Sequence, residues 1–180
     1  MITKTKLNIV LDIGKTNVKL IFVDAKNTTV CSYKTQQKSI NQYGIKTLNS
    51  NSIFEWTIKK ISLIEKKYQL DKFVCTAHGC SIALIDHNNQ EILACTDYEY
   101  KYDQLMNDYK KIAPKFDESF TPFLETGLNI GMQIYYLNKK NPKLIKNTKY
   151  IVNYPQYIAW KFTNNFSSEI SYLGCHTHLW

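Results

Sequence analysis

Two apolar runs separated by one short polar turn, between Leu7 and Asp24, constrain the fold of this chain most strongly. The stretch reads LNIVLDIGKTNVKLIFVD, and its runs of Val, Ile, Leu and Phe are typical of two buried strands that form a hairpin. Thr28–Tyr33 reads as a third strand after a turn at Asp24–Asn27. The chain is therefore expected to open with three antiparallel strands.

The turn between the first two strands carries residues that suggest chemistry. We expect Gly14 to adopt a positive φ angle, so that the N–H groups of Lys15, Thr16 and Asn17 face one concavity and bind an anion. Asp12 adds a carboxylate at the same rim, and a carboxylate that faces a phosphate needs a cation between them. The turn therefore predicts a Mg-nucleotide site with Asp12 at the metal. The alternative is an ordinary hairpin turn that contains a glycine.

Composition indicates one globular domain, because 44% of the 180 residues are hydrophobic and 21% are charged. The net charge is +8, which raises the question of a nucleic-acid partner. However, all 23 basic residues are Lys, and Arg is the usual reader of guanine and the usual bidentate phosphate clamp. The lysines are also scattered along the chain. We therefore expect no nucleic-acid partner.

The amino terminus MITKTK lacks the apolar core of a signal peptide, and no apolar run is long enough to span a membrane. The five cysteines lie in or beside apolar segments and are odd in number, which indicates reduced thiols. These features predict a cytoplasmic protein without membrane contact. Structural zinc is a weaker alternative, with the candidate ligands Cys75, His78, Cys80, Cys175, His176 and His178.

The middle of the chain predicts a parallel addition to the opening sheet. Lys34–Ser50 is polar and is expected to be a loop, and Ser52 with Glu55 forms a capping box for a helix that reaches about Tyr68. Asp71–Thr76 then reads as a short buried strand. A right-handed crossover through the helix would place this strand parallel to the sheet.

Polar residues follow that strand at a position where open α/β sheets bind ligands. His78 and Gly79 come just after it, and Asp97 and Tyr98 follow a second predicted hairpin, formed by Ile82–Ile85 and Glu91–Cys95. An imidazole, a carboxylate and a phenol together suit a polyhydroxylated ligand, because each hydroxyl needs a donor and an acceptor. A structural role for the imidazole is the alternative.

The second half of the chain predicts helices that alternate with one short strand. Thr126–Lys140 is amphipathic and should pack on the opening sheet, whereas Lys149–Val152 reads as a strand. Pro155 suits the first turn of a further helix.

Taken together, these segments resemble the N-terminal domain of the FGGY-family carbohydrate kinases. The matching pieces are LDIGKTNVKL, TAHGCSIALID, ETGLNIGMQIYYL and the stretch from Tyr154 to the C-terminus, so the resemblance covers nearly the whole chain. Kinases of deoxyketoses such as L-fuculose are the most similar members, followed by rhamnulose and xylulose kinases. Lys15 and Tyr98-Glu99 depart from the family pattern.

The resemblance implies an α/β, RNase H-like (actin-like ATPase) fold, with a mixed sheet and helices on both faces. It also implies ATP-dependent phosphorylation of a ketose with Mg²⁺, with Asp12 beside the metal and with Ala77 and His78 at the sugar. Residues 1–180 would be an incomplete N-terminal domain, and the C-terminal ATPase domain and the proton acceptor would lie beyond them. The chain alone is therefore expected to be inactive. A homodimer is one state that the resemblance allows for the complete protein.

Three other functions compete with a kinase. One is a non-catalytic sugar-binding member of the same ATPase superfamily, another is a metal-binding module, and the third is a basic nucleic-acid binder. The segment from Ala77 to Asp86 argues against the first, and the last rests on charge alone.

Overall fold

The structure, a computed structural model, describes residues 4–179, and its contacts divide the chain into two compact units. Unit 1 contains the residues up to Lys38 together with Asn49–His78. Unit 2 contains Ser39–Leu48 and everything from Gly79 onward. Both units are therefore built from segments that are not continuous in sequence.

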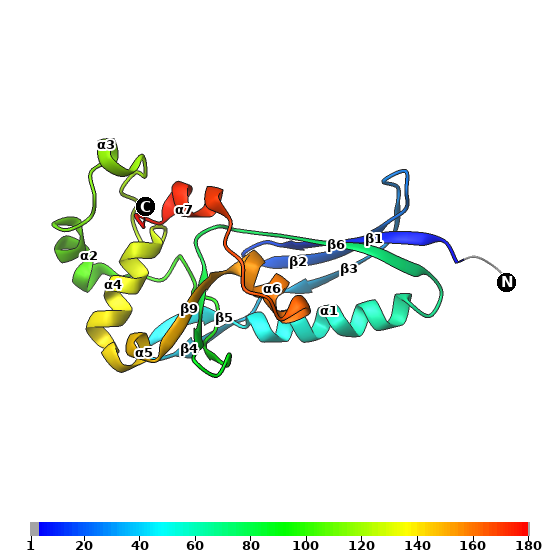
Figure 1. Ribbon diagram of the computed structural model, residues 1–180, viewed down its shortest axis with the longest axis horizontal. Coiled ribbons are helices and arrows are strands. Elements are labelled where there is room, and N and C mark those ends of the chain that lie inside the picture. The colour runs from blue at the N-terminus through cyan, green and yellow to red at the C-terminus, as the bar shows by residue number, and fades with distance from the viewer. Residues whose placement is uncertain (1–3, 180) are drawn as a thin grey trace. The chain divides into compact units, whose positions relative to one another are not determined.

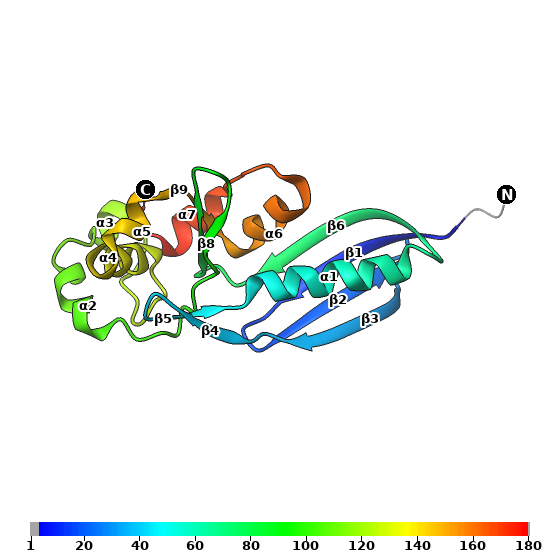
Figure 2. The ribbon, with the colours of Figure 1, turned by 90° about the horizontal axis from the view of Figure 1, so that it is seen from below.

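Unit 1 is a four-stranded mixed sheet with the strand order β3-β2-β1-β6. The strands are β1 (Lys6–Ile13), β2 (Asn17–Val23), β3 (Thr29–Gln36) and β6 (Gln69–Ala77). The first three are antiparallel, and β6 pairs with β1 in parallel, which confirms the predicted opening of the fold. Helix α1 (Ser50–Ile64) lies along one face of this sheet (Figures 1 and 2).

The core of unit 1 follows from strict alternation along β1 and β2. Leu7, Ile9, Leu11 and Ile13 of β1 are buried, as are Val18, Leu20 and Phe22 of β2. Because successive side chains of a strand point to opposite faces, Asp12 lies on the face opposite to these apolar residues. The strand thus buries one row of side chains and leaves the carboxylate on the other row.

Helix α1 begins earlier than its predicted capping box. Asn49 is the N-cap, and its side chain accepts a hydrogen bond from the Ser52 backbone N–H at 3.2 Å. The buried positions include Ile53, Thr57 and Ile64, whereas Ile58 is 38% exposed. Thr57 can be buried because its hydroxyl donates to the Ile53 carbonyl at 2.8 Å.

Strand β6 is not the buried strand that the sequence predicted. It has one neighbour in its sheet, β1, and Val74 is 56% exposed. An edge strand of this kind still provides parallel pairing, but one of its faces stays accessible.

The segment predicted as a loop, Lys34–Ser50, contains a hairpin of β4 (Ser39–Gln42) and β5 (Ile45–Leu48). Tyr43 and Gly44 both have positive φ angles, as a tight two-residue hairpin turn requires. The hairpin belongs to unit 2, where the Leu48 backbone N–H donates to the Cys95 carbonyl at 2.6 Å. The prediction was wrong because this hairpin is stabilised by residues far along the chain.

Unit 2 also contains an antiparallel sheet with the order β8-β7-β9. Its strands are β7 (Ile82–Asp86), β8 (Glu91–Leu93) and β9 (Thr148–Asn153). The predicted hairpin and the later strand are therefore present, but they form a sheet of their own. Asp86 stabilises the hairpin turn, because its carboxylate accepts hydrogen bonds from the backbone N–H groups of Asn88 and Gln90, both at 2.8 Å.

Six helices complete the described part of unit 2: α2 (Asp103–Lys110), α3 (Phe116–Ser119), α4 (Ile130–Lys140), α5 (Pro142–Lys146), α6 (Tyr154–Thr163) and α7 (Ile170–His176). Helix α4 was expected to begin at Thr126, but Thr126 has a φ of 61°, which interrupts a helix.

Helix α4 belongs to unit 2, whereas the opening sheet belongs to unit 1. Its residues Met132 and Leu137 share a buried core with Ile82 and Leu84 of β7. Of the two helices expected on the first sheet, the described part of unit 1 thus holds only α1. Among residues 4–179, no helix is long and apolar enough to cross a membrane.

Candidate active site

The turn that joins β1 to β2 is held by backbone hydrogen bonds at both ends. The Gly14 N–H donates to the Asn17 carbonyl at 2.9 Å, and the Gln37 N–H donates to the Thr16 carbonyl at 2.9 Å. Thr16 and Asn17 are exposed, so their side chains are accessible to a ligand. The second of these bonds ties the turn to the end of β3.

Gly14 does not have the positive φ angle that the sequence predicted, since Gly44 is the glycine with a positive φ among the described residues. The reason for glycine is instead a close approach. A Cβ atom at position 14 would lie 3.0 Å from the Asn17 carbonyl oxygen, which is tighter than almost all real Cβ contacts. The absence of a side chain thus allows the turn to close.

The register of β1 and β6 brings two predicted groups to one edge of the sheet. Asp12 pairs with Thr76, and Ile13 pairs with Ala77. Because the two strands are parallel, their carboxyl ends meet at the same edge. The turn after β1 and the partly buried His78 after β6 are therefore neighbours within unit 1.

Cys75 lies on β6 next to this edge, and the charge of the Asp12 carboxylate affects the pKa of its thiol. Burial raises the pKa of the Cys75 thiol to about 12, and the negative charge of Asp12 adds to the effect. The thiol is accordingly neutral at pH 7 and does not compete with Asp12 for a cation.

The remaining predicted residues, Gly79, Asp97 and Tyr98, belong to unit 2. The Gly79 carbonyl accepts a hydrogen bond from the Asn153 side chain at 3.4 Å. The Tyr98 carbonyl accepts one from the Gly127 N–H at 2.8 Å. Burial raises the pKa of the Tyr98 phenol, with smaller contributions from Glu99 and Cys80.

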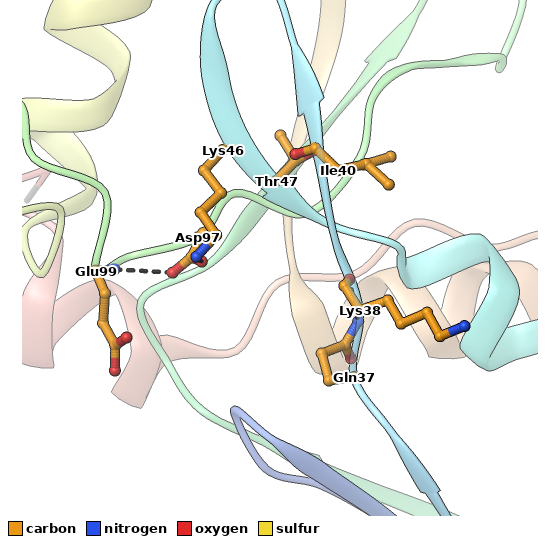
Figure 3. A network of polar contacts seen from close by, with 7 residues as sticks. All are labelled: Gln37, Lys38, Ile40, Lys46, Thr47, Asp97 and Glu99. Carbon is orange, nitrogen blue, oxygen red and sulfur yellow. Dashed lines mark hydrogen bonds and ion pairs between the residues drawn. The ribbon is translucent and has the colours of Figure 1, made fainter.

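Asp97 is fully buried and links the β4–β5 hairpin to the segment that follows β8 (Figure 3). Its backbone N–H donates to the Lys46 carbonyl at 3.0 Å, and its carboxylate lies 3.5 Å from the Lys46 ammonium. The same carboxylate accepts a hydrogen bond from the Glu99 N–H at 3.0 Å. These contacts give Asp97 a structural role in unit 2, and its contact with a sugar stays a prediction.

Sequence reasoning missed Gln133, which supports the segment that follows Gly79. This side chain is fully buried, and its amide donates to the carbonyls of Cys80, at 2.6 Å, and Gly127. Its oxygen accepts from the Thr96 hydroxyl at 2.5 Å. The signal available in the sequence was a glutamine between Met132 and Tyr136, on the apolar side of an amphipathic helix.

The part of the chain that the structure describes contains no cluster of metal ligands. No three His, Cys, Asp or Glu side chains are grouped there so that they could hold a metal ion together. The side chain of His176, one of the candidate zinc ligands, lies outside the described residues. Asp12 thus belongs to no such group, and a cation held there would keep most of its water.

No family model and no curated protein matches the sequence, whereas several solved structures match the fold. A carbohydrate kinase from Novosphingobium aromaticivorans superposes with a TM-score of 0.89 and 27% sequence identity, over 99% of this chain and 38% of that protein. The chain shares the fold of the FGGY carbohydrate kinases.

Two more distant structures support the carbohydrate-kinase fold. A xylulose kinase from Rhodospirillum rubrum has a TM-score of 0.79 at 11% identity, over 93% of this chain and 37% of that one. Plasmodium falciparum glycerol kinase, solved with ADP, has a TM-score of 0.71 at 12% identity, over 92% of this chain and 36% of that one. The chain thus spans less than two fifths of the length of these three proteins. The predicted α/β, actin-like class and the recognition of carbohydrate kinases are confirmed.

Proposed function

We propose that this chain is the N-terminal part of a kinase that transfers the γ-phosphoryl group of ATP to a hydroxyl of a ketose such as L-fuculose, L-rhamnulose or xylulose. The observation that carries the proposal is the parallel register of β1 and β6, which pairs Asp12 with Thr76 and Ile13 with Ala77, the residue before His78. The matches to carbohydrate kinases support the same activity.

On the phosphate side, the residues present suit Mg-ATP. Lys15 supplies a positive charge, the exposed Thr16 and Asn17 supply donors, and Asp12 supplies one carboxylate. Mg²⁺ is usually bound by one or two carboxylates, substrate phosphates and several waters, so one carboxylate is enough. The bound ion would neutralise charge on the phosphates, and the turn would orient them.

On the sugar side, we propose that Ala77, His78 and Gly79 contact the ketose, together with Asp97 and Tyr98. A ketose presents hydroxyls that both donate and accept hydrogen bonds, which an imidazole and a phenol can match. The segment from Gly79 is supported from within unit 2 by Gln133 and Asn153. These supports would keep the sugar contacts in place before a ligand binds.

The described chain contains no assigned proton acceptor for the sugar hydroxyl, and we propose that this residue belongs to a further domain. Residues 1–180 alone should therefore release no ADP in a sugar-dependent manner from Mg-ATP. They could still bind the ketose. A calorimetric titration of the chain with L-fuculose, L-rhamnulose and xylulose, repeated on His78→Ala, tests the sugar side. Equal affinity of both proteins for all three sugars would contradict it.

The phosphate side is tested by Asp12→Asn in a complete form of the kinase that contains this chain. We expect turnover to fall at least a hundredfold while the KM for the sugar changes only a few-fold, because the carboxylate is needed mainly in the transition state.

Asp24→Asn is the matched control for this experiment. Asp24 lies after β2, and its carboxylate accepts hydrogen bonds from the N–H groups of Lys26 and Thr28, which an asparagine oxygen can also accept. Its turnover should equal that of the wild type. Unchanged turnover in Asp12→Asn would make the β1–β2 turn an ordinary hairpin.

A further inference from the structure

Unit 2 contains a cavity of about 640 Å³ that includes none of the residues assigned above to phosphate or sugar. Its lining residues come from the turns of the β4–β5 and β7–β8 hairpins and from the junction of α4 and α5. Its lining residues include Tyr43, Asp86, His87, Lys140, Lys143 and Leu144. This volume is in the range of pockets that bind small molecules.

The side chains around the cavity favour an anionic ligand. Lys140 and Lys143 place two ammonium groups on its wall, and His87 adds an imidazole. Asp86 is the acidic residue among the described lining residues, and one of its oxygens already accepts the two hydrogen bonds of its own hairpin turn. The balance of fixed charge at the wall is therefore positive.

The surrounding sequence adds to the positive charge around the cavity. The lysines are scattered over the chain as a whole, but five of them fall at positions 139, 140, 143, 146 and 149, and all five are exposed. No Asp or Glu occurs in the sequence between Glu125 and Glu169. A concave site within such a field raises the local concentration of anions.

The walls of the cavity are held together without a ligand. The Asn141 side chain donates to the Tyr43 carbonyl at 3.1 Å, and the Asn141 N–H donates to the Leu137 carbonyl at 2.7 Å. The Leu144 N–H in turn donates to the Asn141 carbonyl at 2.9 Å. Binding would therefore need little ordering of the backbone.

The cavity also offers apolar contacts. Leu144 and Ile92 line it, Leu144 is almost fully buried, and Tyr43 is 52% exposed. A phosphate alone would use only the lysines. The apolar and aromatic surface suits a ligand that carries a planar or apolar group as well as a phosphate.

We propose that this cavity binds a small phosphorylated metabolite, with Lys140 and Lys143 at the phosphate and Tyr43 and Leu144 against the remainder of the molecule. The site does not depend on the proposed kinase activity. It would give the chain a second place for a phosphorylated compound, separate in sequence from the turn after β1.

The test is a calorimetric titration of the 180-residue chain with AMP and with inorganic pyrophosphate, in low salt without Mg²⁺. We compare the double variant Lys140→Gln/Lys143→Gln with the control Lys146→Gln/Lys149→Gln. Both variants lose two positive charges from one basic segment, but only the first alters the wall of the cavity. We expect AMP to bind at least tenfold more weakly to the first variant and within threefold of the wild type to the control.

Circular dichroism and amide NMR spectra of each variant show whether the protein is folded, so that weaker binding can be distinguished from unfolding. Chemical-shift changes on AMP addition should centre on residues 43, 87 and 140–144. Shifts confined to Gly14–Asn17 would place the probe at the phosphate turn and overturn the proposal, as would the absence of wild-type binding at millimolar AMP. Equal weakening in both variants would show a diffuse basic surface, of the kind that binds nucleic acid, and would also overturn it.

Discussion

Gln133→Leu should strongly destabilise unit 2, because this side chain joins three segments of the buried core. Its amide N–H groups donate hydrogen bonds to the carbonyls of Cys80 and Gly127. Its oxygen accepts a hydrogen bond from the Thr96 hydroxyl. Leucine has nearly the same volume but can make none of these bonds. The change therefore removes hydrogen bonds without creating a large cavity.

The magnitude follows from the number of partners left behind. A hydrogen bond contributes about 1 kcal/mol net, and a buried polar group without a partner costs about 1–3 kcal/mol. Two buried carbonyls and one hydroxyl lose their partner, so we expect a loss of about 3–5 kcal/mol. With a denaturant slope of about 2 kcal/mol per molar urea, the midpoint should fall by roughly 2 M.

Gln156→Leu is the matched control, because it makes the same chemical change on helix α6 of the same unit. The Gln156 side-chain oxygen is buried without a hydrogen-bond partner among the described residues. Its removal should therefore leave the urea midpoint unchanged or raise it slightly. Both midpoints are measured by circular dichroism. A midpoint for Gln133→Leu within about 0.5 M of the wild type would refute this account of the Gln133 contacts.

Two further predictions concern unit 1. Because burial and the Asp12 charge raise the pKa of the Cys75 thiol from 9.0 to about 12, the folded chain keeps a proton that the unfolded chain releases. Stability should therefore fall as the pH rises from 9 to 12, and Cys75→Ser should reduce that slope in urea titrations; an identical slope would contradict the assignment. Asn49→Ala removes the N-cap of α1 and should cost about 1 kcal/mol, measured by urea unfolding, whereas Asn49→Ser should cost less.

The opening of the fold was predictable because its signals are local. The runs on either side of Gly14 are apolar enough to be strands in any context, and the helix and strand that follow fit a parallel crossover. From that pairing, the closeness of Asp12 to Ala77 and His78 followed. The glycine itself was recognised for the wrong reason, because a carbonyl contact cannot be read from one residue type.

What could not be predicted depends on partners far along the chain. The strand Ser39–Gln42 has no clear alternation, and its hairpin is stabilised at Thr96 and Cys95. Asn49 and Ser52 are both good cap residues, so the sequence alone does not select the start of α1. Gln133 resembles any polar residue on a helix until its three partners are in place. Each of these features requires tertiary structure.

The position of the β4–β5 hairpin has a consequence for how the chain can be divided and synthesised. The backbone passes between the units after Lys38, after Leu48 and after His78, so no single cut releases both units whole. A fragment that starts at Gly79 would lack Ile45, which belongs to the core around Leu84 and Leu137. On the ribosome, unit 1 can close once His78 has emerged, whereas the hairpin must wait for Ala94–Asp97. Slow translation between these points would prolong the exposure of Ile45 and Leu48.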